Sequence, residues 1–478
     1  MRKNVRKLGI FFIILTLALF FNLSYIQVFG QQSLRDNQAN TRRLREEYGI
    51  DRGRIITADG EVAAESVESE GALVYQRFYP LSWLLCHVVG YDSPQFGRSG
   101  LEQEYNEYLL GRLPSQGWVE QLTRIREEGF DLYTTVDTGV QRAAAEALGE
   151  RKGAVMAINP KTGAVLAMYS WPNFDPNALV SQETDAEGGL VAETVMQSYA
   201  RSSSSPLLNR CSMGLYPPGS SFKVVTSSAG ITSGFPVSTE YACPGIWEVG
   251  GSRVVNYGSP PKDFGVIDMD TALTLSVNTY FAQLAVDMGG EALVGCTRGF
   301  GVNQSIPIDY PSVAVSSIPG PGEMDLVELA WTGAGQGQLL FTPLQLGLIG
   351  CGIANGGRVM RLHLMKDIRN GDEILNRYES EVWTEPISSE TASQVLEMMK
   401  DVVASGTGTQ AAIPGVTVAG KTGTAEVGEG MPNHAWFLGI APAENPQVVV
   451  AVIVENSGGG GGSVAAPIAR EVIEAALE

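Results

Sequence analysis

The longest apolar run of this chain lies at its N-terminus. A group of basic residues within the first seven positions precedes an uncharged run from Leu8 to Phe29. A helix rises about 1.5 Å per residue, so this run is long enough to cross a hydrocarbon core of about 30 Å. Positive flanks stay in the cytoplasm. We therefore expect residues 1–7 to be a cytoplasmic tail, residues 8–29 a transmembrane anchor, and the remainder to be extracytoplasmic.

A cleaved signal peptide is the alternative interpretation of this run. The apolar stretch is long for a signal peptide, and its end around Gly30 lacks the small-x-small pattern of a cleavage site. We therefore expect an uncleaved anchor. The polar, charged residues that follow, to about Tyr48, carry little apolar periodicity and predict a membrane-proximal stalk.

Shorter apolar runs divide the rest of the chain into two parts. From about Gly49 to Gly153 these runs are broken by Gly and Pro, which predicts a small extended module with a strand over 131–137. We therefore expect residues 30–152 to form the stalk and a non-catalytic module. A larger domain is predicted over residues 153–478.

This larger domain begins and ends with strand patterns. Two apolar runs around a turn over 154–168 predict a hairpin, and a polar stretch over 176–205 predicts a surface loop. Helical patterns then dominate to about Val403. The elements expected after them are strands at 416–419, 435–440 and 448–454 and a terminal helix at 465–477. Strands at both ends of a domain indicate an α+β fold whose sheet draws on distant sequence.

Charge and composition exclude several kinds of function. The formal net charge of −19 argues against a nucleic-acid partner, because phosphate binding needs clustered Lys and Arg. The five cysteines include no C-x-x-C pair and the three histidines no H-E-x-x-H pattern, so no metal site is expected. No G-x-S-x-G elbow is present either. A nucleophile, if there is one, needs a base other than histidine.

A serine and a lysine stand one helical turn apart, directly after a Pro-Pro-Gly turn. They are Ser220 and Lys223, and residues at this spacing face each other on a helix. A serine hydroxyl needs a neighbouring base, and a lysine can be that base only if burial or nearby positive charge lowers its pKa. Alone, this pattern is common on solvated helix faces.

Ser276 and Asn278 form a second candidate pair, Ser-x-Asn, within an otherwise apolar helical stretch. Their hydroxyl and carboxamide could relay a proton and hold a substrate amide. A polar pair that caps a helix is the alternative interpretation. The pair acquires weight only together with the other motifs.

A third candidate site is Lys421-Thr422-Gly423-Thr424 on a predicted strand. A cationic lysine with strand hydroxyls can bind a carboxylate, and the glycine leaves room for a ligand along the strand. A simple turn is the alternative.

The ordered set Ser-x-x-Lys, Ser-x-Asn and Lys-Thr-Gly is shared by penicillin-binding proteins and class A β-lactamases. Further likeness lies in Asn209-Arg210, in Gly333 to Gly337 with Thr342-Pro343, in His434-Ala435-Trp436-Phe437, and, near the N-terminus, in Arg52-Gly53-Arg54 and Gly100-Leu101-Glu102. The chain resembles a class B penicillin-binding protein, a monofunctional D,D-transpeptidase of the short form. The resemblance implies a transpeptidase domain like that of serine β-lactamases, with an antiparallel sheet flanked by helices.

The resemblance also implies a mechanism. Ser220 would attack the carbonyl between the last two D-alanines of a stem peptide, with Lys223 as general base. Ser276 and Asn278 would complete proton transfer and orient the substrate. An amine of a neighbouring stem would then release the acyl group. No cofactor is needed for this chemistry.

The same resemblance assigns substrate binding to the Lys-Thr-Gly strand. Lys421 would hold Lys223 neutral by like-charge repulsion and attract the terminal carboxylate, which the hydroxyls of Thr422 and Thr424 would bind. The N–H groups of Ser220 and Thr424 would form an oxyanion hole.

The expected partners are stem peptides, β-lactam antibiotics, the cytoplasmic membrane and a membrane glycosyltransferase of wall synthesis during cell division or elongation. A β-lactamase is one alternative, although no Glu stands where it could activate water for deacylation. A membrane β-lactam sensor and a catalytically silent division scaffold are others. The short cytoplasmic tail argues against the sensor, and the intact motif set against the scaffold.

Overall fold

The computed structural model describes residues 46–69, 73–113, 128–186, 188–428 and 430–478. The predicted cytoplasmic tail, transmembrane anchor and most of the stalk lie outside these residues. Within the described ranges, no helix has both the length and the apolar character required to cross a bilayer.

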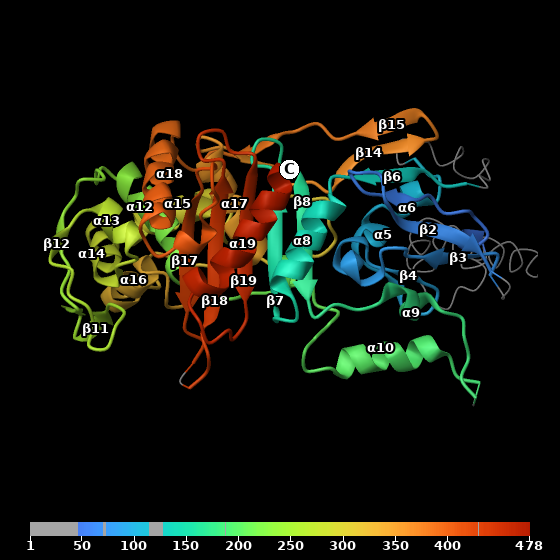
Figure 1. Ribbon diagram of the computed structural model, residues 1–478, viewed down its shortest axis with the longest axis horizontal. Coiled ribbons are helices and arrows are strands. Elements are labelled where there is room, and N and C mark those ends of the chain that lie inside the picture. Colours follow the sequence, from blue (N-terminus) through green and yellow to red (C-terminus); the bar gives the residue numbers. More distant parts are fainter. Residues whose placement is uncertain (1–45, 70–72, 114–127, 187, 429) are drawn as a thin grey trace, which may run out of the picture.

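A five-stranded antiparallel sheet forms the centre of the larger domain (Figure 1). Its strands, in spatial order, are β17 (Ala419–Ala425), β18 (His434–Ala441), β19 (Val448–Val454), β7 (Gly153–Ile158) and β8 (Val165–Trp171). The predicted hairpin is confirmed as β7 and β8. The last three strands of the chain pair with the first two of this domain through β19 and β7, as the α+β expectation requires.

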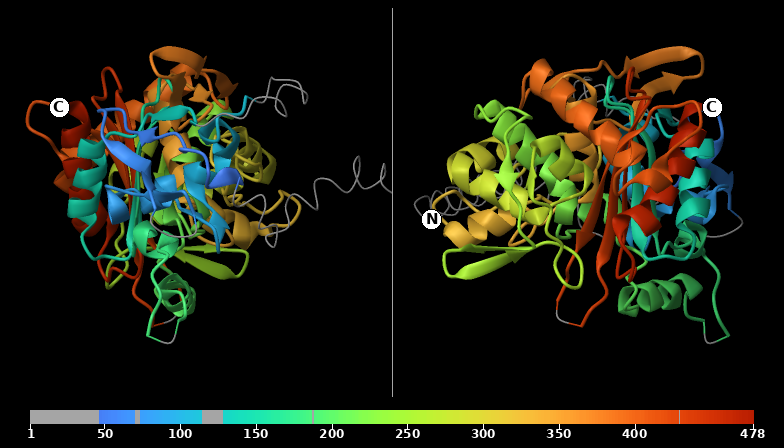
Figure 2. Two further views of the ribbon diagram at one scale, coloured as in Figure 1. Left: turned by 90° about the vertical axis from the view of Figure 1, so that its right-hand side faces the viewer. Right: turned by 60° about the vertical axis from the view of Figure 1, so that its left-hand side comes forward.

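Helices cover both faces of this sheet. The helices α8 (Thr138–Leu148) and α19 (Gly461–Leu477) lie side by side on one face, and α17 (Pro343–Ala354) packs on the other (Figures 1 and 2). Leu438 of β18 faces α17, whereas the next residue, Gly439, faces α19. Successive residues of a strand point to opposite faces, so the uniformly apolar β18 needs cover on both.

A helical lobe adjoins the edge strand β17. Its helices are α12 (Lys223–Thr232), α13 (Met269–Thr274), α14 (Asn278–Met288), α15 (Gly290–Gly299), α16 (Leu326–Gly333) and α18 (Ser389–Ala404). α12 lies at the centre of the lobe, against α14, α15 and α18, and is almost entirely buried. The lobe also carries short strands: β9 (Tyr241–Ala242), β10 (Ile246–Val249), β11 (Ser252–Val255) and β12 (Val266–Ile267).

The N-terminal module is built on a six-stranded sheet. In spatial order its strands are β15 (Glu373–Arg377), β14 (Met365–Asn370), β6 (Asp131–Thr134), β1 (Ile55–Ile56), β2 (Val62–Glu68) and β3 (Tyr75–Phe78). Figure 1 shows β14 and β15 reaching from the larger domain to lie beside β6. This sheet therefore combines sequence from both predicted parts, while the boundary at residue 153 stays a prediction.

Short elements complete the module and its junction with the larger domain. They are η1 (Ser82–Leu84), α4 (Cys86–Val89), β4 (Asp92–Ser93), β5 (Gly97–Arg98), α5 (Gly100–Glu104) and α6 (Asn106–Leu109). One continuous apolar core runs from this module through the central sheet.

The polar stretch over 176–205 contains two helices, so the predicted loop is wrong. They are α9 (Pro176–Val180) and α10 (Val191–Arg201). α9 begins after Asp175, whose carboxylate accepts the N–H of Asn177, with proline at the first helical position. In α10, apolar residues at helical spacing pack against a cluster around Phe174. Most residues of the segment are polar, so the helical spacing of its few apolar residues is not evident from the sequence.

Two boundaries also differ from the predictions. The strand expected at 416–419 begins only at Ala419 and continues through the Lys-Thr-Gly motif. The terminal helix begins at Gly461 rather than at 465, because it includes the end of the Gly458–Gly462 run.

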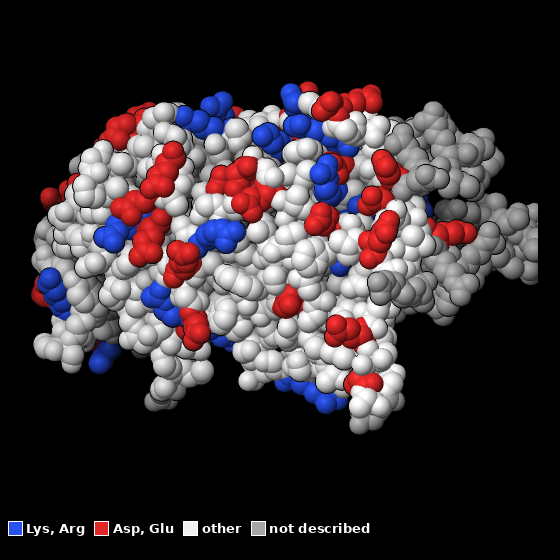
Figure 3. Space-filling model, turned by 45° about the vertical axis from the view of Figure 1, so that its right-hand side comes forward, with Lys and Arg blue, Asp and Glu red and all other residues white. Residues whose placement is uncertain are grey.

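The surface carries charges of both signs. On the face in Figure 3, Lys and Arg are interspersed with Asp and Glu.

Candidate active site

The predicted nucleophile and base share one turn, as expected. Ser220 lies in the short helix η2 (Gly219–Phe222), and Lys223 begins α12. The Lys223 Nζ atom is 3.1 Å from the Ser220 Oγ atom. Gly219 has φ +56°, and a Cβ atom there would lie 2.6 Å from the Thr424 carbonyl oxygen. Glycine therefore allows the segment of residues 216–220, called the serine loop below, to approach β17.

The Ser-x-Asn pair lies at the junction of two helices rather than within one. α13 ends at Thr274 and α14 begins at Asn278. Ser276 has φ +59°, a left-handed conformation that is costly for a residue other than glycine and is often found at functional sites. The Ser276 carbonyl oxygen and the Asn278 Oδ1 atom each lie 2.7 Å from the Lys223 Nζ atom. Asn278 thus contacts the lysine and does not merely cap α14.

The third motif meets the other two through Ser276. Lys421 lies on β17, and its Nζ atom donates to the Ser276 Oγ atom at 2.9 Å. The Lys223 Nζ atom lies 3.3 Å from the same oxygen. The Ser276 hydroxyl therefore connects the two lysines. Residues from η2, α12, the α13–α14 turn and β17 meet around it.

Burial sets the protonation of both lysines. Their side chains are fully buried. Burial, and second the charge of Lys421, hold the pKa of Lys223 well below its usual value. Burial lowers the pKa of Lys421 to about 7. The equilibrium of Lys223 is thus shifted towards the uncharged amine, and the predicted repulsion by Lys421 contributes less to this shift than burial does.

The remaining residues of the Lys-Thr-Gly strand lie beside the serine loop. A Cβ atom on Gly423 would be 2.9 Å from the Pro218 carbonyl oxygen, so glycine is needed for this contact. The Thr422 hydroxyl lies 2.7 Å from that of Thr407, and the Thr424 hydroxyl accepts the N–H of Gly461 at 3.4 Å. The predicted contacts of both threonines with a carboxylate stay predictions.

Sequence reasoning missed Thr407. Its backbone N–H donates to the Thr274 carbonyl oxygen at 3.3 Å, and its hydroxyl contacts Thr422. It therefore links the Ser276 turn to β17. The available signal was weak, since a threonine between two glycines after a helix is also an ordinary turn.

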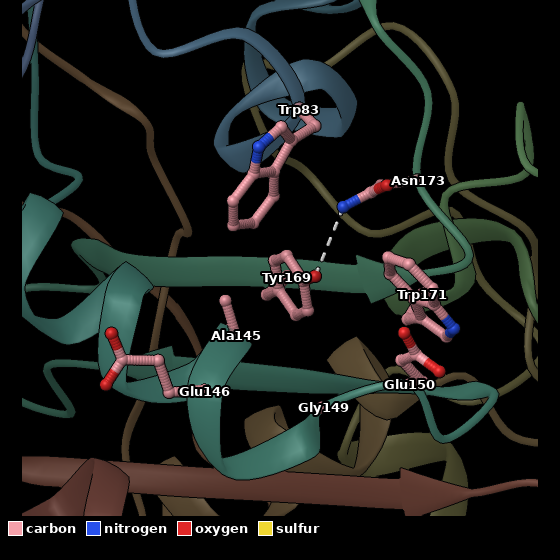
Figure 4. Close-up of a pocket in the computed structure, with 8 residues that line it drawn as sticks. All are labelled: Trp83, Ala145, Glu146, Gly149, Glu150, Tyr169, Trp171 and Asn173. Carbon is pink, nitrogen blue, oxygen red and sulfur yellow. Dashed lines mark hydrogen bonds between the residues drawn. The ribbon is translucent and has the colours of Figure 1, made fainter.

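A separate cavity of about 410 Å³ lies near the opposite edge strand, β8 (Figure 4). Its lining residues are Trp83, Ala145, Glu146, Gly149, Glu150, Tyr169, Trp171 and Asn173. The lining includes none of the predicted site residues. Since β17 and β8 are the two edges of the sheet, this cavity is distinct from the site around Ser220.

Two family models match parts of this chain. Residues 153–474 match the family described as the penicillin binding protein transpeptidase domain, and residues 52–129 match the penicillin binding protein A dimerisation domain. This chain is a class B penicillin-binding protein. The resemblance drawn from the three motifs is therefore confirmed, and the larger domain has the penicillin-binding transpeptidase fold.

Individual relatives agree with this family over nearly the whole chain. The peptidoglycan D,D-transpeptidase PbpA of Mycobacterium tuberculosis is 34% identical over 500 residues, covering 100% of this chain and 99% of the relative. A solved imipenem acyl-enzyme complex of penicillin-binding protein A from M. tuberculosis has a TM-score of 0.83 and 34% identity, covering 91% of this chain and 100% of that one. A D,D-transpeptidase domain from Eggerthella lenta has a TM-score of 0.79 and 35% identity, covering 90% and 98%.

Proposed function

We propose that this class B penicillin-binding protein is a peptidoglycan D,D-transpeptidase that cross-links stem peptides through an acyl-enzyme on Ser220. β-Lactams acylate the same serine. The observation that carries the proposal is the buried Lys223 amine 3.1 Å from the Ser220 Oγ atom, with a pKa that burial holds well below its usual value. The D,D-transpeptidase name of the M. tuberculosis relative and its solved imipenem acyl-enzyme support it.

The contacts of Lys223 define the path of the proton. An uncharged amine has two hydrogens and one lone pair. The two shortest contacts, both 2.7 Å, are to the Ser276 carbonyl and the Asn278 Oδ1 atom, which can only accept. They take both hydrogens. The lone pair is left for the Ser220 hydroxyl, which makes Lys223 the general base for attack on the D-Ala-D-Ala carbonyl.

Lys421 has two functions in this reaction. A terminal carboxylate that enters the site raises the pKa of Lys421 and keeps it cationic, and this charge favours the neutral form of Lys223. The Ser276 hydroxyl between the two amines returns a proton to the leaving D-alanine. The N–H groups of Ser220 and Thr424 stabilise the oxyanion, and such a donor is typically worth about 3 kcal/mol in acyl transfer.

We further propose that residues 8–29 anchor the protein in the cytoplasmic membrane with the catalytic domain outside. The basic flank and the uncharged run support this orientation. In this proposal a separate membrane glycosyltransferase supplies the glycan strands for septal or elongation growth.

A labelled penicillin tests the site. We expect it to label the purified extracytoplasmic domain and Ser220→Ala to abolish the label. Ser228→Ala is the control, because Ser228 lies on the same helix with its hydroxyl bonded to the Val224 carbonyl. Label retained on Ser220→Ala refutes the assignment. Hydrolysis of the adduct within seconds, rather than persistence over many minutes, supports the β-lactamase alternative.

A further inference from the structure

A buried carboxylate joins three segments behind the nucleophile. Glu455 directly follows β19, and its side chain is only 9% exposed. It accepts a hydrogen bond from the Tyr216 hydroxyl at 2.8 Å and from Arg210 Nε at 2.7 Å, and it lies 2.9 Å from Lys152 Nζ. Tyr216 is the partner that belongs to the serine loop.

Tyr216 anchors the start of that loop. Its backbone pairs with Phe341 at 3.0 and 2.8 Å, and its ring meets the ring of Trp436 edge-on at 6.0 Å. The Trp436 Nε1 atom donates to the Pro217 carbonyl oxygen at 2.9 Å. The tyrosine is thus fixed by the backbone of Phe341, the ring of Trp436 on β18 and its own hydroxyl partner, Glu455.

The segment from Tyr216 to Ser220 is stiff. Two consecutive prolines, Pro217 and Pro218, have φ locked near −65° and cannot absorb a shift of Tyr216. A displacement at Tyr216 therefore reaches the Ser220 hydroxyl.

We propose that Glu455 is a positioning residue for acylation, acting on Ser220 through the Tyr216 hydroxyl. The proposal rests on the proposed function above. Glu455 does not touch the reacting atoms. It holds the loop at the distance from Lys223 at which proton transfer occurs, and small misplacements of reacting groups lower rates strongly.

The experiment compares Tyr216→Phe, Glu455→Gln and the double variant. The readouts are the limiting acylation rate by a chromogenic β-lactam and the dissociation constant of the noncovalent complex. We expect Tyr216→Phe to lower the limiting rate about tenfold and Glu455→Gln about three- to tenfold, with dissociation constants within about twofold. The double variant should be no slower than Tyr216→Phe, because residues on one path are not additive.

Lys152→Ala is the matched control. It removes the 39% exposed partner of the same carboxylate, an interaction of small energetic value. It should leave the limiting rate within about twofold. A loss equal to that of Glu455→Gln would overturn the proposal.

Two further outcomes would overturn it. One is a lower unfolding midpoint with an unchanged limiting rate in the folded fraction, which makes Glu455 purely structural. The other is multiplication of the two single effects in the double variant, which excludes Tyr216 as the path. If the wild-type protein takes up no β-lactam at all, the proposed function itself fails instead.

Discussion

At the scale of single residues, two buried lysines with different proton affinities make the chemistry possible. Lys223 is surrounded by acceptors and has the more strongly lowered pKa, whereas Lys421 retains a pKa of about 7. The difference matters because the base, Lys223, must be neutral, while Lys421, which binds the substrate carboxylate, must be charged. One pH range therefore suits both.

This difference predicts the pH dependence of acylation. Burial holds the pKa of Lys223 well below its usual value, which favours the neutral form that a general base needs. Lys421 loses its charge as the pH rises through about 7. We therefore expect the second-order acylation constant of a carboxylate-bearing β-lactam, which reports on the free enzyme, to fall above about pH 7.

The variant Lys421→Arg tests whether Lys421 is the group whose titration causes the alkaline decline. Arginine stays protonated over the accessible range, so the variant should acylate more slowly but lose the alkaline decline. An unchanged alkaline limb in this variant would assign the titration to another group.

At the scale of elements, glycines allow three segments to meet. The serine loop lies between β17 and the turn after α16. A Cβ atom on Gly335 would lie only 2.0 Å from the Gly219 carbonyl oxygen. Because backbone atoms line this contact, no side chain could move aside to relieve a clash.

Gly335→Ala should therefore displace the serine loop. Gly335 has φ +92°, so alanine there also costs about 1 kcal/mol of backbone strain. Gly234→Ala is the matched control, with φ +93° and no atom within 4 Å of the added Cβ. Both variants should unfold at lower temperature, but only Gly335→Ala should acylate at least about tenfold more slowly. Equal acylation rates would contradict the contact.

At the scale of the whole molecule, the two modules share a sheet and a polar anchor. β14 follows a turn that is held by Asp309. The two carboxylate oxygens of Asp309 accept the N–H groups of Leu364 and Met365 at 2.7 and 2.8 Å, and the hydroxyl of Tyr105 at 2.6 Å. Tyr105 belongs to the N-terminal module, so one carboxylate ties this module to the strand that joins it.

Asp309→Ala should weaken the contact between the two modules and leave acylation unchanged. Each donor left unsatisfied costs about 1–3 kcal/mol, so we expect a lower unfolding midpoint and faster proteolysis near residues 365–377. Penicillin acylation of the folded protein should stay within about twofold. Asp372→Ala, at the exposed turn between β14 and β15, should change neither property. A loss of acylation in Asp309→Ala without a lower midpoint would mean that the module acts directly on the site.

Much of the site could be predicted from the sequence because it depends on near neighbours. The spacing of Ser220 and Lys223 places both on one helical turn, and short continuous apolar runs predict β18 and β19. The helix α10 was missed because its few apolar residues acquire meaning only against the cluster around Phe174. Local pattern alone could not reveal that cluster.

The sequence by itself determined the motif set, the hairpin and the strands at both ends of the larger domain. Only the tertiary structure decided the left-handed turn at Ser276, the contact of Thr407 with β17, the addition of β14 and β15 to the N-terminal sheet, and the burial that lowers the pKa of Lys223. The first group rests on interactions between residues a few positions apart. The second needs burial and close approach of segments distant along the chain, which exist only after folding.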